Sequence, residues 1–347
     1  MSRQWGAARI VERLRRLRSG DSRRLRLVLV VLLLAVTFAQ PAIRLQRPRF
    51  EMIVVLDVTQ SMDVQDMELA GRPVSRLAFA RQALRRAIEE LPCGSKLGWA
   101  IFTEYRSFLL FAPVEVCANR AELRATLDGI DNRMAWTGSS EIAKGLHSAI
   151  GIAKALPGVP SLVFVTDGHE APPLSPRHRP AFDDKPGEVG GLIVGVGGST
   201  PVPIPKSDSA GRPLGFWSAD EVLQVDPRSL GRDASVRGET MTEDPDAVPA
   251  PVGLGATPGA EHLSSLREPY LQLLAAENGL VFHRLLQPQA LAEALQASAL
   301  ARPVLTRVDA RVPLAALALA LLLSLWLPRP KFVGANRVQR RAAAARP

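Results

Sequence analysis

The chain has 347 residues, of which 47% are hydrophobic and 22% charged, enough apolar material for a sizeable core. Its formal net charge is +9, but residues 1–26 carry +7 and residues 329–347 carry +6, which leaves −4 for residues 27–328. Because the basic residues gather in two tails and not on one face of the central part, the composition argues against a nucleic-acid-binding protein.

The first and last predicted elements are two uncharged windows, residues 27–43 and 312–328. Each holds 17 residues, at the short end of the range for a transmembrane helix. Each also adjoins a basic tail, so the positive-inside rule predicts two membrane passes, cytoplasmic tails at 1–26 and 329–347, and a central domain on the far side of the lipid bilayer. A signal peptide cleaved after Thr37-Phe38-Ala39 is the alternative for the first window.

Between these windows, short apolar runs alternate with amphipathic stripes, which predicts a doubly wound, mostly parallel α/β sheet. Helices are expected at 77–91, from about residue 140, and at 266–278. The predicted strands are 53–56, 97–103, 108–112, 162–165, 191–196 and 280–285. In such a Rossmann-like sheet, ligands bind beyond the carboxyl ends of the strands.

Two predicted strands run directly into turns rich in acids and hydroxyls. Asp57, Thr59 and Ser61 follow the first strand, Asp167 follows the strand 162–165, and Ser140 lies where a loop enters a helix. Carboxylate and hydroxyl oxygens suit a hard divalent cation such as Mg²⁺, so these five residues are the predicted metal ligands. The alternative is that Asp57 and Ser61 only cap a helix and Asp167 begins an ordinary turn.

In their order and spacing, these pieces resemble the metal-ion-dependent adhesion site of von Willebrand factor A domains, over roughly residues 50–300. The family pattern is Asp-x-Ser-x-Ser, then a Thr on a middle loop, then an Asp. Here Thr59 replaces a Ser and Ser140 replaces the Thr, and both keep a hydroxyl. The resemblance implies a bound cation, Mg²⁺ or else Ca²⁺ or Mn²⁺, with an open position that a partner protein's Asp or Glu carboxylate fills.

The residues around the site resemble membrane-anchored bacterial members of this family that are found with MoxR-type ATPases, including the Bat aerotolerance proteins. Residues 57–62, 91–95 and 135–140 look most like the methanol-utilisation members, which are associated with maturation of a periplasmic quinoprotein dehydrogenase. The resemblance implies an inner-membrane protein with a periplasmic domain, acting as an assembly or maturation factor. Its implied partners are a periplasmic client, a MoxR-type ATPase and related von Willebrand factor A proteins.

The two cysteines bracket a predicted hairpin. Cys93 and Cys117 each lie twelve residues from Tyr105, near which the strands 97–103 and 108–112 turn. An antiparallel pairing would place the cysteines opposite each other at its open end and allow a disulfide, which requires an oxidising compartment. Two separate reduced cysteines are the alternative.

Residues 198–260 are rich in Pro, Gly and Asp and show no lasting periodicity. They predict an insertion, either solvated and poorly ordered or a partner-binding flap that uses Phe216-Trp217 and the acids from Glu239 to Asp246.

No enzymatic activity is predicted. Asp57 after a strand superficially resembles the nucleophile of haloacid dehalogenase phosphatases, but Thr59 stands where those enzymes need a general acid. Neither His147 nor His169 accompanies a Gly-x-Ser-x-Gly nucleophile motif. The predicted function is a metal-dependent protein-binding module. The alternatives are a metal-free structural or regulatory membrane subunit and a metal-dependent phosphatase.

Overall fold

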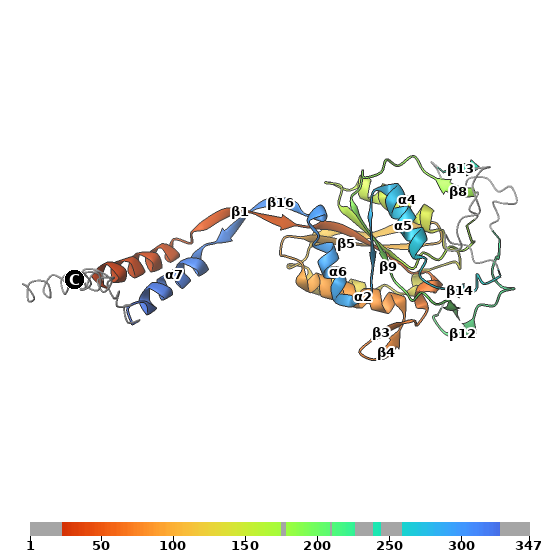
Figure 1. Cartoon of the computed structure of the whole chain (residues 1–347), viewed down its shortest axis with the longest axis horizontal. Coiled ribbons are helices and arrows are strands. Elements are labelled where there is room, and N and C mark those ends of the chain that lie inside the picture. Colours follow the sequence, from red (N-terminus) through yellow and green to blue (C-terminus); the bar gives the residue numbers. More distant parts are fainter. Residues whose placement is uncertain (1–22, 175–177, 209, 226–238, 244–258, 327–347) are drawn as a thin grey trace, which may run out of the picture. The chain divides into compact units, whose positions relative to one another are not determined.

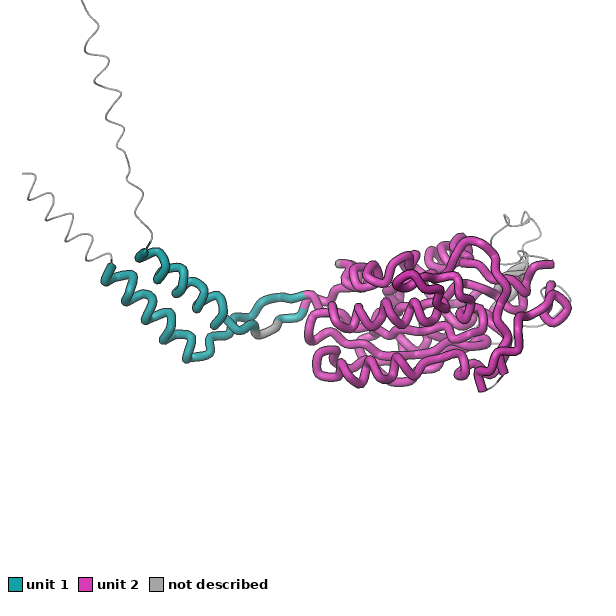
Figure 2. Tube along the Cα trace, turned by 90° about the horizontal axis from the view of Figure 1, so that it is seen from below, with its two compact units in different colours: residues 1–47, 304–347 teal, residues 48–303 magenta. Residues whose placement is uncertain are grey.

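The computed structural model describes residues 23–174, 178–208, 210–225, 239–243 and 259–326 (Figure 1). The chain divides into two compact units, one of Pro48–Pro303 and the other of Met1–Arg47 with Val304–Pro347 (Figure 2). The predicted basic tails fall almost wholly outside the described residues.

The larger unit is built on a six-stranded sheet. Its strands are β2 (Glu51–Asp57), β5 (Lys96–Thr103), β6 (Arg106–Glu115), β7 (Ser161–Thr166), β9 (Gly191–Gly195) and β15 (Val281–Arg284). They lie in the order β15-β9-β7-β2-β5-β6, and all neighbours are parallel except the edge pair β5 and β6. Counted along the chain the order is 3-2-1-4-5-6, so the winding direction reverses between β2 and β7. The predicted doubly wound sheet is confirmed.

The central strand shows why this sequence forms a sheet covered on both faces. Met52, Val54 and Leu56 pack into one core, and Ile53 and Val55 pack into the other. The first core holds helices α2 (Arg76–Glu90), α3 (Arg120–Gly129) and α6 (Pro288–Leu295), and the second holds α4 (Ile142–Ala155) and α5 (Glu268–Asn278) (Figure 1). Because β2 is buried on both of its faces, its sequence is a nearly continuous apolar run.

Local signals set the helix positions. The Ser75 hydroxyl caps α2 by accepting the Ala78 N–H at 3.2 Å. Gly279 closes α5 in the left-handed conformation at φ 67°. Gly145 lets α4 approach the sheet, because a Cβ there would lie 2.1 Å from the Phe102 ring. Helices α2, α4 and α5 match the predictions, whereas α3 and α6 were not predicted.

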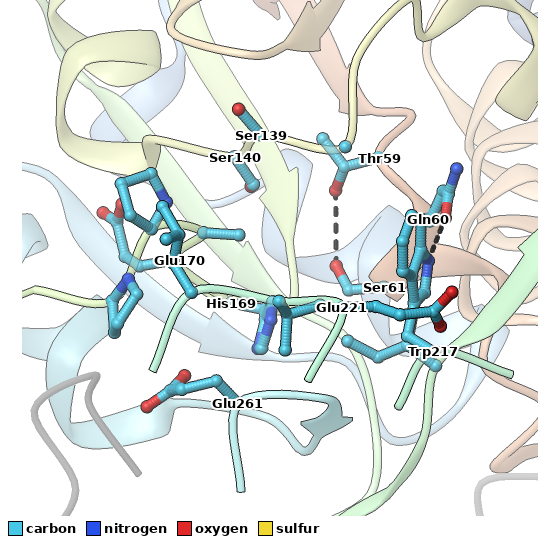
Figure 3. Close-up of a pocket in the computed structure, with 17 residues that line it drawn as sticks. Thr59, Gln60, Ser61, Ser139, Ser140, His169, Glu170, Trp217, Glu221 and Glu261 are labelled. Carbon is cyan, nitrogen blue, oxygen red and sulfur yellow. Dashed lines mark hydrogen bonds between the residues drawn. The ribbon is translucent and has the colours of Figure 1, made fainter. Parts of the chain in front are cut away.

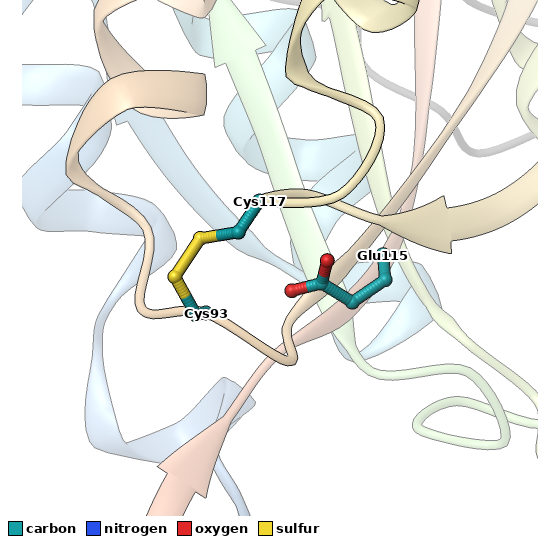
Figure 4. Close-up of side chains that lie close together, drawn as sticks. All are labelled: Cys93, Glu115 and Cys117. Carbon is teal, nitrogen blue, oxygen red and sulfur yellow. A yellow bond between two sulfur atoms is a disulfide. The ribbon is translucent and has the colours of Figure 1, made fainter.

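The hairpin of β5 and β6 brings the two cysteines together (Figure 4). Cys93 and Cys117 form a disulfide with their Cα atoms 5.2 Å apart. The Glu115 carboxylate closes the same end of the hairpin by accepting the backbone N–H groups of Gly94 and Ala118. The predicted disulfide is confirmed.

The predicted insertion contains regular structure in its described parts. Strand β10 (Val202–Pro203) pairs with β14 (Leu263–Ser264), β11 (Pro205–Ser207) pairs with β12 (Pro213–Phe216), and β13 (Thr240–Glu243) pairs with β8 (His178–Ala181). Residues 202–203, 205–207 and 213–216 of the predicted insertion are therefore paired in short strands, although most of the described residues in this segment are exposed or half-buried. Strands this short and rich in Pro leave no periodic signal, and tertiary contacts decide their pairing.

In the smaller unit, residues 23–38 are helical. Strand β1 (Ala42–Arg49) pairs with β16 (Arg302–Asp309), and α7 (Arg311–Leu323) follows. These helices overlap the predicted windows at 27–43 and 312–328. Across the described ranges, no helix combines the length and the apolar character that crossing a bilayer requires.

Candidate metal centre

The predicted ligands lie where the sheet changes winding direction. Strands β2 and β7 are parallel neighbours, and the pairing of Leu56 with Val165 brings their carboxyl ends together. Thr166 donates its hydroxyl hydrogen to Asp57 Oδ2 at 2.6 Å, and Asp167 follows as the next residue. The switch point of a doubly wound sheet is the expected place for a ligand site.

Four of the five predicted ligands form one chain of hydrogen bonds. Thr59 donates its backbone N–H and its hydroxyl to Asp57 Oδ1 at 2.9 and 2.7 Å. The Thr59 and Ser61 hydroxyl oxygens lie 3.3 Å apart, and Ser61 donates to Asp167 Oδ1 at 3.1 Å. Both carboxylates are fully buried. Residues more than a hundred positions apart thus meet in one cluster.

Ser140 lies in the loop before α4. Its backbone N–H donates to the Ala171 carbonyl at 2.6 Å, and the Ala171 N–H donates back at 2.7 Å, which ties this loop to the one after β7. The Ser140 hydroxyl oxygen is buried, and within the described part of the chain it has no hydrogen-bond partner. An unpaired buried hydroxyl costs about 1–3 kcal/mol of stability. Since no described protein group offsets this cost here, the oxygen is free to bind a ligand.

The three hydroxyl-bearing ligands line one cavity of about 180 Å³ (Figure 3). Thr59, Ser61 and Ser140 contribute to its wall, whereas Asp57 and Asp167 do not. The two carboxylates instead lie behind the hydroxyls that they hydrogen bond. At these hydroxyls the cavity therefore meets neutral oxygens with carboxyls behind them, while Glu170, Glu221 and Glu261 also line its wall.

A buried arginine side chain, which was not predicted from the sequence, also belongs to the cluster. Arg76 Nη1 donates to Asp167 Oδ2 at 2.5 Å and to Ser264 Oγ at 2.6 Å, while Nε and Nη2 reach the Asp66 carboxylate. The side chains of Arg76 and Asp167 are both 0% exposed. Burial, the largest effect, raises the pKa of Asp167, but the Arg76 charge together with the hydrogen bonds from the His169 N–H and the Ser61 hydroxyl outweighs it, so the pKa is lowered and Asp167 stays ionised.

Asp57 differs from Asp167 in its charge environment, because among the described residues no cationic side chain forms an ion pair with Asp57. Burial, and then the negative charge of Asp167, raise the pKa of Asp57 to about 7, although hydrogen bonds from Thr166 and Thr59 oppose this. Near neutral pH this carboxyl is therefore protonated in part of the molecules, and a bound divalent cation would displace that proton. An oxygen-only donor set, an uncompensated buried carboxyl and the unpaired Ser140 hydroxyl together fit a hard cation.

The two histidines considered in the sequence have different places. His169 lines the cavity, as its position after Asp167 suggested, and burial lowers its pKa to about 4, so its ring is neutral. Its backbone N–H donates to Asp167 Oδ1 at 2.9 Å. His147 does not line the cavity, and it contacts Asp184 and stacks on Phe182. Among the described residues, the buried Nδ1 atom of His169 has no hydrogen-bond partner.

No family model matches the chain. It is 29% identical over 145 residues to a UPF0353 protein from Nocardia farcinica, a match that covers 42% of this chain and 38% of that protein. It is 26% identical over 222 residues to a UPF0353 protein from Mycobacterium bovis, covering 61% of each. In both cases the match spans less than two thirds of the relative.

Similar solved structures include an aerotolerance-related membrane protein from Bacteroides fragilis, with a TM-score of 0.44, 17% identity, and coverage of 71% of this chain and 96% of that one. BatB, a conserved hypothetical protein from Bacteroides thetaiotaomicron, gives a TM-score of 0.42 at 17% identity, covering 71% and 95%. A von Willebrand factor type A protein from Catenulispora acidiphila gives 0.35 at 12%, covering 77% and 42%. By its own strand order, 3-2-1-4-5-6 with one antiparallel edge strand in this sheet, the larger unit is a doubly wound α/β domain.

Proposed function

We propose that the domain binds a divalent cation through Asp57, Thr59, Ser61, Ser140 and Asp167, and that the loaded site binds an Asp or Glu carboxylate of a partner protein. Mg²⁺ is the first candidate, and Ca²⁺ and Mn²⁺ are the alternatives. When bound, the cation supplies an electrophilic position for that carboxylate. The buried, unpaired hydroxyl of Ser140, which lines the same cavity as Thr59 and Ser61, is the observation that carries the proposal.

The layering of the cluster supports this function. Neutral hydroxyls on the cavity side do not repel an incoming carboxylate, whereas the two buried carboxyls behind them favour a cation. Arg76 compensates one of the two carboxyls, so a divalent ion bound here keeps an excess of positive charge toward the cavity.

A non-catalytic role is part of the proposal. A neutral His169 and a Thr at position 59 offer no general acid to a phosphoryl or acyl transfer reaction. The metal-loaded protein is expected to leave a generic phosphate ester unhydrolysed, and sustained turnover that is lost in Asp57→Ala would support the phosphatase alternative instead.

We also propose that the domain lies on the periplasmic side of a bacterial inner membrane, with both tails cytoplasmic. The basic tails and the disulfide support this arrangement, since a disulfide persists in an oxidising compartment. In this setting a periplasmic client, for which a quinoprotein dehydrogenase is one candidate, would be the partner, and a MoxR-type ATPase would act from the cytoplasm. A topology reporter fused after Pro303 should report the periplasm, and one fused after Pro347 the cytoplasm.

Calorimetric titration of Mg²⁺, Mn²⁺ and Ca²⁺ into the full-length protein in lipid nanodiscs tests the cation site. We expect saturable binding in the wild type, loss in Asp57→Ala, and retention in Asp128→Ala, which removes an aspartate with a half-exposed side chain. Equal binding by both variants would contradict the assignment. A chelator should then abolish binding of an acidic peptide.

A further inference from the structure

The cavity above the hydroxyls is walled partly by the insertion. We propose that it is a recognition pocket for an Asp or Glu that adjoins a bulky apolar residue on a partner protein. This inference rests on the proposed function and adds the chemistry of the ligand. It predicts that the insertion, and not the cation site alone, selects the partner.

The pocket has two chemically different sides. One side carries the hydroxyls of Thr59, Ser61 and Ser140, and the rest of the wall is largely apolar. The apolar residues come from the loop after β7 and from the insertion: Pro172, Pro173, Ile204, Trp217, Val222 and Leu223. A carboxylate at the hydroxyl side would leave this apolar surface uncovered, so a ligand with an adjoining apolar side chain fits better.

Trp217 is held across the edge of the pocket (Figure 3). Its backbone N–H donates to the Ile204 carbonyl at 3.0 Å, and its indole N–H donates to the Gln60 side chain, which lies between Thr59 and Ser61 in sequence. A Cβ at Gly138 would lie 4.0 Å from the Trp217 ring, so the ring also reaches the loop that carries Ser140. The insertion therefore places a rigid aromatic wall against both ligand-bearing loops.

Residues 214–216 and 223–225 of the insertion carry exposed large apolar side chains. Leu214 and Phe216 on β12 are 59% and 62% exposed, and Leu223 and Val225 are each 60% exposed. Four such side chains within twelve residues are a high density for a surface that meets only water. Of the four, Leu223 lines the cavity, so contact with an apolar side chain beside the acidic residue of a partner would cover it.

Acidic residues in the wall are engaged by neighbouring groups. Glu170 accepts the Tyr270 hydroxyl at 2.5 Å and the Ala143 N–H at 3.2 Å, and Glu221 pairs with Lys206. Glu261 is the third acidic residue. Burial lowers the pKa of Arg267 and the negative charge of Glu261 opposes this shift, so Glu261 interacts electrostatically with the Arg267 guanidinium. With a cation at the hydroxyls, the charge of the pocket complements an acidic ligand.

Peptide binding to the full-length, Mg²⁺-loaded protein in nanodiscs tests the pocket. The probes are an acetylated and amidated Gly-Leu-Asp-Leu-Gly peptide, the same peptide with Gly in place of both Leu, and the Leu peptide with Asn in place of Asp. We expect the Leu-flanked acidic peptide to bind about tenfold more tightly than the Gly-flanked one, from the burial of one apolar side chain.

That preference should vanish in Trp217→Ala and Leu223→Ser. It should persist in Trp136→Ala, which removes an equally large, 55% exposed indole that does not line the cavity. All variants are assayed at saturating Mg²⁺, so that the peptide preference is compared between fully loaded proteins. As a second readout, the 5-fluorotryptophan signal that disappears in Trp217→Phe should shift with the Leu-flanked peptide and not with the Gly-flanked one.

The outcomes separate this inference from the function on which it rests. Equal affinity of the two acidic peptides for the wild type, or an undiminished preference in Trp217→Ala, would contradict the proposed recognition pocket. Neither result would contradict cation binding. Failure of every acidic peptide to bind the Mg²⁺-loaded protein, or equal binding of the Asn peptide, would overturn the proposed function and the pocket together.

Discussion

Replacement of Arg76 by Met should strongly destabilise the metal-free protein. The side chain keeps an unbranched apolar stem but is shorter and loses the guanidinium that pairs with Asp167 and Asp66. Asp167 would then share a fully buried cluster with Asp57 without a compensating cation. Since breaking a buried ion pair by removing one partner costs about 3–5 kcal/mol, the variant should unfold roughly 10 °C below the wild type.

Thermal unfolding followed by circular dichroism measures this effect, with Arg124→Met as the matched control. Arg124 pairs with Glu89 at 3.1 Å, but both side chains are about half exposed, so its loss should cost less than about 1 kcal/mol. The double variant Arg76→Met with Asp167→Asn should be more stable than Arg76→Met alone, because it removes the stranded charge. A loss in Arg76→Met no larger than in Arg124→Met, or additive losses in the double variant, would refute this reasoning.

Other contacts of the site and of the fold carry three further predictions. Ser140→Ala should weaken cation binding measured by calorimetry yet leave the thermal stability of the metal-free protein equal or higher, because it removes a buried hydroxyl that has no partner among the described residues; a large loss of stability with unchanged binding would contradict its role. Cation affinity should fall about tenfold per pH unit below pH 7 and level off above it, because the Asp57 carboxyl, with its pKa raised to about 7, must lose a proton; equal affinity at pH 6 and pH 8 would rule this out. Cys93→Ser should lower the free energy of unfolding in urea by about 3 kcal/mol, because the disulfide closes a loop of 24-residue separation; an unchanged unfolding midpoint would show that the bridge contributes nothing.

The sequence predicted those elements whose pattern is local. Strand β2 is a continuous apolar run that ends in Asp57, and α2 combines an apolar stripe with a Ser cap, so both were recognisable. The disulfide followed from the symmetric spacing of Cys93 and Cys117 about one hairpin turn. Helices α3 and α6 have ten and eight residues, are the shortest α-helices of the described larger unit, and were not predicted.

The cluster itself was only partly predictable. The order of strands and motifs indicated which oxygens would meet, but not that hydroxyls would face the cavity and carboxylates lie behind them. Arg76 resembled an ordinary surface residue at a helix start, since its burial depends on Asp66 and Asp167 from other segments. Trp217 was noted as part of a flap, but its hydrogen bond to Gln60 depends on short strand pairs that carry no periodic signal.

Anomalous diffraction from a crystal of the protein soaked in Mn²⁺ would locate the bound cation. We expect one strong peak among the hydroxyls of Thr59, Ser61 and Ser140, on the cavity side of Asp57 and Asp167. A fully soaked crystal with no peak at these hydroxyls, or with its strongest peak at another group of carboxylates, would contradict the proposed cation site.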